Sequence, residues 1–140
     1  MTFKSYIFDD YLYIPKLGIQ EKIYLGYSET VLDFGVWLIP NTSLPNLGGN
    51  TVLSAHRFVY GIGKNAPFIN LNMLNPKDII YVYWRGKEYV YEVEEKIEVE
   101  SNENWILDGG STNTLTLFTC TPLFNPIHRL VIISKLVSIR

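Results

Sequence analysis

The chain has 140 residues, which is enough for one domain with a continuous core that needs no disulfide or metal. A formal net charge of -2, without a cluster of Lys and Arg, argues against nucleic acid or an anionic membrane surface as the main partner. The single cysteine excludes an intramolecular disulfide and a multi-cysteine zinc site, and no run of 18 apolar residues is present to span a bilayer.

Strand-forming residues dominate the chain. Ten Tyr, seven Phe and three Trp accompany many Val, Ile and Thr, which favour strands over helices. Residues 1–10 carry no clear period and predict a lead-in segment, followed by one domain over residues 11–140. Short strands are predicted at 11–14, ahead of Pro15, and at 22–25.

The centre of the chain predicts short elements between loops. Ser28 is an expected N-cap of a short helix that ends near Asp33. Residues 40–50 are rich in Pro, Gly and Asn and predict a loop, and the strand 51–56 that follows ends on a histidine. Further elements are expected at 35–39 (apolar), 58–66 (a loop), 67–73 (a short helix that begins at Pro67), 75–78 (a turn), and 79–84 with 87–99 (a hairpin).

The last third predicts a polar loop and two strands. Residues 101–113 form the loop, with one helical turn around Trp105, and strands are expected at 114–120 and 129–137. Some eight short strands separated by turns predict an all-β domain, a closed barrel or a sandwich, because closure removes exposed strand edges.

Three residues at strand ends are candidates for chemistry. Cys120 ends one strand and Arg129 begins the next, so an antiparallel pair would hold both at the same end of the sheet. His56 also ends a strand. A cysteine attacks carbonyls as its thiolate, a histidine can carry protons, and an arginine supplies a fixed positive charge for an oxyanion. Taken singly, each residue also fits a structural role, as a buried thiol, a hydrogen-bonded histidine or a surface arginine.

His128 is the rival to His56, because it lies close to Cys120 in the sequence. Strand alternation, however, points His128 and Arg129 to opposite faces, so both could not readily serve one site.

The strand Thr114-Leu-Thr-Leu-Phe-Thr-Cys120 resembles the signature strand of the sortases, in which a TLxTC-type segment ends on the nucleophile. The resemblance extends over nearly the whole chain, from about Tyr11 to Val137. Other segments similar to the family are Leu12-Tyr-Ile-Pro-Lys-Leu-Gly-Ile19, Gly35-Val-Trp-Leu-Ile-Pro40, Gly49-Asn-Thr-Val-Leu-Ser-Ala-His-Arg57, Phe68-Ile-Asn-Leu-Asn-Met-Leu74 with Asp78, and His128-Arg-Leu-Val-Ile132.

The resemblance implies an eight-stranded closed β-barrel with one or two short helices, and a cysteine transpeptidase. It implies that Cys120 is the nucleophile, His56 the general acid and base, and Arg129 the stabiliser of substrate and oxyanion. The implied substrate is an LPXTG-like sorting signal cleaved between Thr and Gly through a thioacyl-enzyme. An amine from a cell-wall precursor or a pilin lysine then accepts the acyl group. No cofactor is implied.

Substrate contacts are expected around these residues. Thr119 and Thr121 flank the nucleophile, and Ala55 stands where the family usually has glycine before the catalytic histidine. Trp105, Ile106 and Leu107 are expected to line a pocket for the Leu-Pro part of the signal, or to pack under their own loop.

The class of sortase stays open at this point. The loop 121–128 resembles that of the pilin-polymerising class C, yet no Asp-Pro-aromatic lid segment is present, and classes D and E remain alternatives. The family's membrane anchor is absent from this sequence, which suggests an ectodomain at the extracellular face of the bacterial membrane. Residues 40–50 contain no acid, so no calcium site is expected. The competing functions are a hydrolytic cysteine peptidase and a non-catalytic β-barrel binding module.

Overall fold

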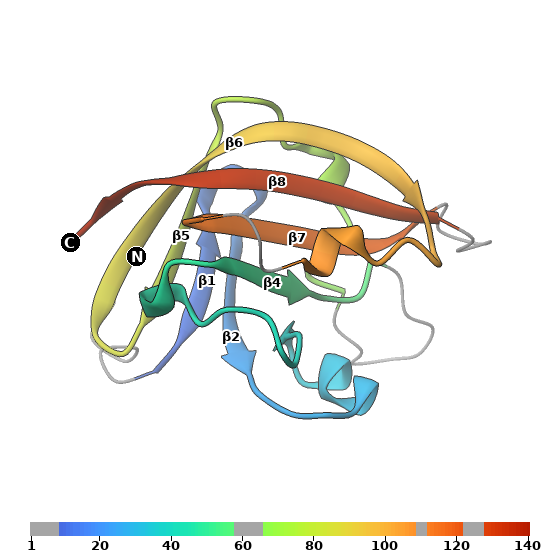
Figure 1. Ribbon diagram of the computed structural model, residues 1–140, viewed down its shortest axis with the longest axis horizontal. Coiled ribbons are helices and arrows are strands. Elements are labelled where there is room, and N and C mark those ends of the chain that lie inside the picture. Colours follow the sequence, from blue (N-terminus) through green and yellow to red (C-terminus); the bar gives the residue numbers. More distant parts are fainter. Residues whose placement is uncertain (1–8, 58–65, 109–111, 122–127) are drawn as a thin grey trace.

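The computed structural model describes residues 9–57, 66–108, 112–121 and 128–140, with Cys120 and Thr121 described by their backbone. Eight strands form a closed barrel in the order β1-β2-β3-β4-β7-β8-β6-β5 (Figure 1). The strands are β1 (Tyr11–Ile14), β2 (Ile19–Tyr24), β3 (Val36–Leu38), β4 (Asn50–Ser54), β5 (Ile79–Trp84), β6 (Lys87–Glu100), β7 (Thr114–Thr121) and β8 (His128–Ile139). The expected all-β barrel is therefore confirmed.

Five short 3₁₀ helices connect the described strands. They are η2 (Pro15–Leu17), η3 (Glu29–Asp33), η4 (Pro45–Leu47), η5 (Leu71–Met73) and η6 (Trp105–Leu107). The expected Ser28 cap is present, since its Oγ accepts a hydrogen bond from the Thr30 N–H at 3.3 Å. The helical turn at Trp105 is also present, whereas the helix predicted from Pro67 is reduced to η5.

Apolar alternation explains how the barrel closes around its core. The residues of β5 alternate between partly and fully buried positions, as a strand with one inward face requires. The β5–β6 hairpin turns at Arg85 and Gly86, whose φ values of 50° and 82° are both left-handed. The interior is filled by side chains from most strands, among them Leu12, Val36, Leu53, Val82, Leu115, Leu117 and Ile132.

A second, smaller apolar cluster lies outside this core. Val99, Ile106 and Val131 are its buried members, and Phe118 packs against them. These residues come from β6, η6, β8 and β7, so the cluster fixes the loop that carries η6 on the outer face of three strands. Figure 1 shows η6 beside β7 and the long pair β6 and β8.

Several predicted strand bounds were wrong, and the last strand, for example, ends at Ile139 rather than residue 137. The second strand begins at Ile19 rather than residue 22, because residues 19–22 pair with β1 immediately after the turn at Gly18. β4 ends at Ser54, two residues before His56. The carbonyls of Ala55 and His56 accept hydrogen bonds from the Thr119 hydroxyl and the Phe68 N–H instead of extending the strand ladder. Most of the loop expected at 58–66 lies outside the described residues.

Candidate active site

Strand register brings the predicted site positions to one end of the barrel. In the antiparallel pair of β7 and β8, Cys120 stands directly opposite Arg129. In the parallel pair of β4 and β7, Ser54 is level with Phe118. His56 lies two residues beyond Ser54, where β4 ends, and Cys120 lies two residues beyond Phe118, as the second-last residue of β7, so both lie at the same end of neighbouring strands.

Hydrogen bonds hold these strand ends together. The Ser54 hydroxyl donates to the Phe118 carbonyl at 3.0 Å, and the Thr119 hydroxyl donates to the Ala55 carbonyl at 2.8 Å. One residue further on, the Phe68 N–H donates to the His56 carbonyl at 3.0 Å. The backbone on either side of the predicted histidine and cysteine is thus fixed before any ligand arrives.

Arg129 presents its charge on the outer face of this end. Its guanidinium carbon lies 5.0 Å from the centre of the Phe118 ring, a cation–π contact that orients the planar group. Its buried Nη1 has no hydrogen-bond acceptor among the described residues. The guanidinium thus keeps a positively charged donor that no described acceptor uses.

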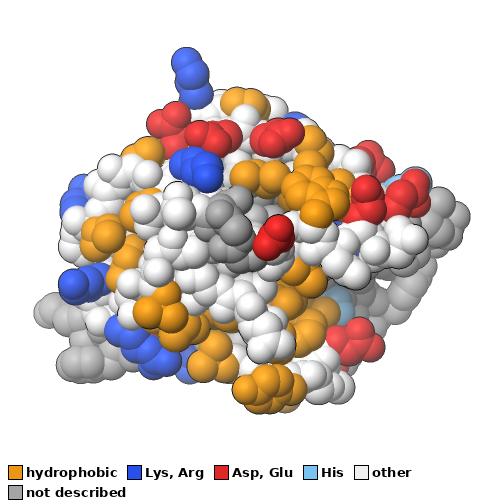
Figure 2. All heavy atoms as spheres, viewed as in Figure 1, with side chains coloured by type: hydrophobic (Ala, Val, Ile, Leu, Met, Phe, Trp, Pro, Cys, Tyr) orange, Lys and Arg blue, Asp and Glu red, His pale blue; other side chains and the backbone are white. Residues whose placement is uncertain are grey.

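The two histidines have different surroundings. His56 Nε2 lies 3.2 Å from Asp33 Oδ1. His128 Nε2 lies 3.3 Å from Glu100 Oε1, and its Nδ1 lies 3.8 Å from Glu98 Oε1. Figure 2 shows acidic side chains along the edge where β6 runs, and hydrophobic side chains in separate groups across the same face. His128 thus contacts carboxylates of β6, while Arg129 lies over Phe118.

Asp33 was missed by the sequence reasoning. It is the last residue of η3, a segment recognised by its Ser28 cap and not by any pattern of charges. Its approach to His56 depends on the pairing of β3 with β4, which is not visible in the local sequence.

The residues expected to contact substrate occupy several environments. Thr119 and Ala55 are buried and hydrogen-bonded to each other. Trp105 is 50% exposed, whereas Ile106 is buried in the outer cluster and Leu107 packs against that cluster. Only the backbone of Thr121 is described. Among the members whose side chains the structure describes, Trp105 is therefore the one with most exposed surface.

Asn50, which the sequence analysis placed in a loop, anchors the η6 segment. Its side-chain amide donates to the carbonyls of Ile106 and Asp108, each at 3.0 Å. Its Oδ1 accepts from the Thr116 hydroxyl at 2.8 Å. This buried side chain links β4, β7 and the loop that carries Trp105.

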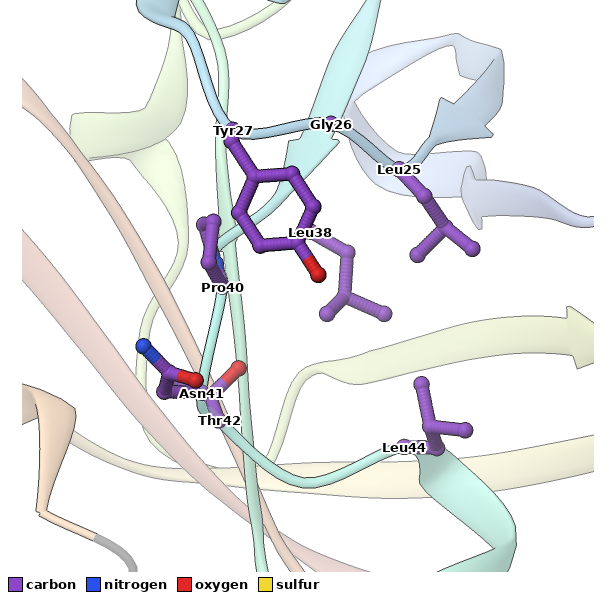
Figure 3. Close-up of a pocket in the computed structure, with 8 residues that line it drawn as sticks. All are labelled: Leu25, Gly26, Tyr27, Leu38, Pro40, Asn41, Thr42 and Leu44. Atoms are coloured by element: carbon purple, nitrogen blue, oxygen red, sulfur yellow. The ribbon is translucent and has the colours of Figure 1, made fainter.

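An apolar pocket of about 200 Å³ lies elsewhere, between the end of β2 and the β3–β4 connection (Figure 3). It is lined by Leu25, Gly26, Tyr27, Leu38, Pro40, Asn41, Thr42 and Leu44. None of the predicted site residues lines it.

In the described part of the chain, no group of three or more His, Cys, Asp or Glu side chains could hold a metal ion. The described residues also include no helix long and apolar enough to cross a membrane.

A closed eight-stranded barrel with a cysteine opposite an arginine, and a histidine after the neighbouring strand, defines a candidate cysteine enzyme of the barrel type. The Sortase domain model matches residues 12–137. The chain therefore belongs to the sortase family.

Individual relatives agree with this assignment. Sortase SrtE1 of Streptomyces coelicolor is 33% identical over 92% of this chain, which spans only 40% of that protein's length. The structure of sortase C from Streptococcus pneumoniae matches 91% of this chain and 65% of its own, with 31% identity and a TM-score of 0.81. Sortase C-1 of Actinomyces oris matches 92% of this chain and 73% of its own, with 32% identity and a TM-score of 0.82.

Proposed function

We propose that this chain is a cysteine transpeptidase acting on proteins with an LPXTG-like sorting signal. The observation that carries the proposal is the strand register, which sets Cys120 opposite Arg129 and brings Cys120, near the end of β7, to the same end of the barrel as His56, which follows β4. Membership of the sortase family supports the same reading.

In the first half-reaction the Cys120 thiolate attacks the carbonyl carbon of the Thr–Gly bond. The negative charge that develops on the carbonyl oxygen is stabilised by the guanidinium of Arg129, whose Nη1 is otherwise unpaired among the described residues. As the carbon–nitrogen bond breaks, His56 donates a proton to the departing glycine amine. A thioester between Cys120 and the threonine carbonyl remains.

In the second half-reaction an amine replaces the thiol. His56, now neutral, takes a proton from the incoming amine as that nitrogen attacks the thioester carbonyl. The carbon–sulfur bond breaks, and Cys120 leaves as a thiolate. The products are the new amide and the starting enzyme, so protons and charge balance over one turnover.

The signal is held by residues around this end of the barrel. Trp105, with Ile106 and Leu107 behind it, supplies an apolar wall for the Leu-Pro part. Thr119 and Ala55 support this function through their hydrogen bond, which links β7 to the segment after β4. Thr121, the residue after the nucleophile in the sequence, is the further proposed contact for the signal. Residues 11–140 act as the catalytic domain.

We place the reaction at the extracellular face of the bacterial cell membrane, where sorted proteins and cell-wall precursors meet. The acceptor is an amine of a peptidoglycan precursor or of a pilin lysine. Several structural relatives are pilus-related sortases by name, which favours the pilin acceptor and class C. Sortase SrtE1, in contrast, is not a class C sortase by name, so this relative does not favour class C.

The acyl-enzyme is the direct test. A fluorogenic sorting-signal peptide should yield a covalent adduct on Cys120 by mass spectrometry, and Cys120→Ala should form none. Turnover by Cys120→Ala at the wild-type rate would refute the proposal. Added triglycine or hydroxylamine should divert most product to the amide or hydroxamate, whereas a hydrolytic peptidase would release mainly free acid.

A binding module without catalysis is tested by thiol reactivity. If the chain is a transpeptidase, the Cys120 thiol should react with iodoacetamide faster than the buried thiol of a control protein does, and His56→Ala should slow the reaction. Slow alkylation that His56→Ala leaves unchanged would favour the binding module.

A further inference from the structure

The contact between His56 and Asp33 places a carboxylate against one nitrogen of the expected proton carrier. Asp33 Oδ1 lies 3.2 Å from His56 Nε2, and the two side chains are 51% and 28% exposed. This distance and pairing fit an Nε2–H donor and a carboxylate acceptor.

The fold holds Asp33 in this position. Asp33 ends η3, whose first turn is capped by Ser28 and which is followed immediately by Phe34 and Gly35. A Cβ at Gly35 would lie 3.0 Å from the Lys22 carbonyl oxygen and 3.0 Å from the Tyr24 ring, so the chain passes closely against β2 here. The segment is therefore packed against the barrel before it enters β3.

The antiparallel pairing of β3 and β4 then brings Asp33 to the histidine. Trp37 stands opposite Ser54, so residues that precede β3 lie beside residues that follow β4. The end of η3 and His56 meet through this arrangement, at the same end of the barrel as Cys120 and Arg129.

A carboxylate on Nε2 decides which imidazole nitrogen does the chemistry. A neutral imidazole has one N–H donor and one acceptor, and the hydrogen bond at one nitrogen sets the role of the other. We propose that Asp33 is a positioning residue that keeps the proton of neutral His56 on Nε2 and presents Nδ1 for proton exchange with the substrate amine. This inference rests on the proposed transpeptidase function.

The chain contains its own comparison for this arrangement. His128 lies beside two carboxylates as well, with Glu100 at 3.3 Å from its Nε2. If any carboxylate beside a histidine at this end of the barrel supported activity, removing Glu100 would lower activity as much as removing Asp33. If Asp33 positions the working histidine, only the Asp33 variants should do so.

The kinetic test compares Asp33→Ala, Asp33→Asn and Glu100→Gln in steady-state transpeptidation of a sorting-signal peptide with triglycine. Asp33→Ala should lower kcat about tenfold with KM within about twofold, since orientation of a general acid accounts for part of its effect. Asp33→Asn, which keeps an acceptor oxygen, should recover part of kcat. Glu100→Gln should match wild type. Because the side chains of Asp33 and Glu100 are 51% and 66% exposed, all three variants should keep the wild-type thermal midpoint closely.

A second readout does not need turnover. The ring nitrogens of the two histidines can be followed by ¹⁵N NMR, with His128→Gln used to assign His56. Neutral His56 should be Nε2-protonated in the wild type and a mixture of tautomers in Asp33→Ala. A His56 spectrum unchanged by Asp33→Ala, or kcat within about twofold of wild type, would overturn the positioning role. An equal loss in Glu100→Gln would overturn it too. Activity retained by Cys120→Ala would instead refute the transpeptidase proposal, while the NMR result would still test the tautomer.

Discussion

Asn50 should be the side chain whose loss most directly frees the loop that carries Trp105. Asn50→Ala removes two hydrogen bonds to the carbonyls of Ile106 and Asp108 and one from the Thr116 hydroxyl. Each hydrogen bond contributes about 1 kcal/mol net, so the expected loss is roughly 3 kcal/mol of unfolding free energy. Thr116→Val removes one of the three and should lose about 1 kcal/mol.

Urea unfolding followed by circular dichroism measures these losses. The double variant should be more stable than the sum of the single losses predicts, by about 1 kcal/mol, because both changes remove the same hydrogen bond. Asn46→Ala is the matched control, since Asn46 is exposed in η4 and should change stability by less than about 0.5 kcal/mol.

Limited proteolysis adds a local measurement, with faster cleavage within residues 101–113 of Asn50→Ala. A loss below about 1 kcal/mol, with cleavage unchanged, would show that Asn50 does not hold this loop.

Three further outcomes are expected. Phe118→Leu removes the ring under the Arg129 guanidinium and should lower kcat/KM about threefold to tenfold in the peptide assay, with the circular dichroism spectrum unchanged. Ile106→Ala should lose about 2 kcal/mol in urea unfolding, because its side chain is buried in the outer cluster. Burial raises the pKa of Asp78, but its hydrogen bonds and the positive charge of Lys16 outweigh this and leave the pKa below its ordinary value. Its stabilising contribution is therefore present above about pH 3.9 and is lost as pH falls through the folded-state pKa. Asp78→Asn should cost less than about 1 kcal/mol near pH 7, and this difference should shrink as the pH falls below the range in which the unfolded carboxyl titrates.

The strand content and fold class were predictable because they depend on local patterns. The alternation in residues 79–84 and the Arg85-Gly86 turn predicted the β5–β6 hairpin, and its bounds agree closely with the structure. The exact end of β4 was not predictable, because it depends on the Thr119 hydroxyl, a partner 64 residues away. Local sequence does not reveal that a distant hydroxyl will take the hydrogen bond that a neighbouring strand would otherwise make.

The positions of the candidate site residues were predictable from the sequence, but the residues that hold them and the neighbouring loop in place were not. Cys120 and Arg129 were placed at one end of adjacent strands by the length of the loop between them, and the register agrees. Their catalytic roles remain proposals. Asp33 and Asn50 could not be found, because both act through contacts with residues distant in the sequence.

The parallel pairing of β4 with β7 has a consequence for how the molecule folds. Paired residues of these two strands lie 64 positions apart in the chain, as Ser54 and Phe118 do, and β7 is otherwise held only by β8 among the described strands. Pairings between distant segments must overcome the entropy of closing long loops, so they form late. The segment after β4 that carries His56 and the end of β7 that carries Cys120 should therefore come together only in the last stage of folding, once β8 has joined β6 to β7. A folding intermediate that already contains the β5–β6 hairpin would lack a working site, so recovery of activity should lag behind recovery of strand structure on refolding.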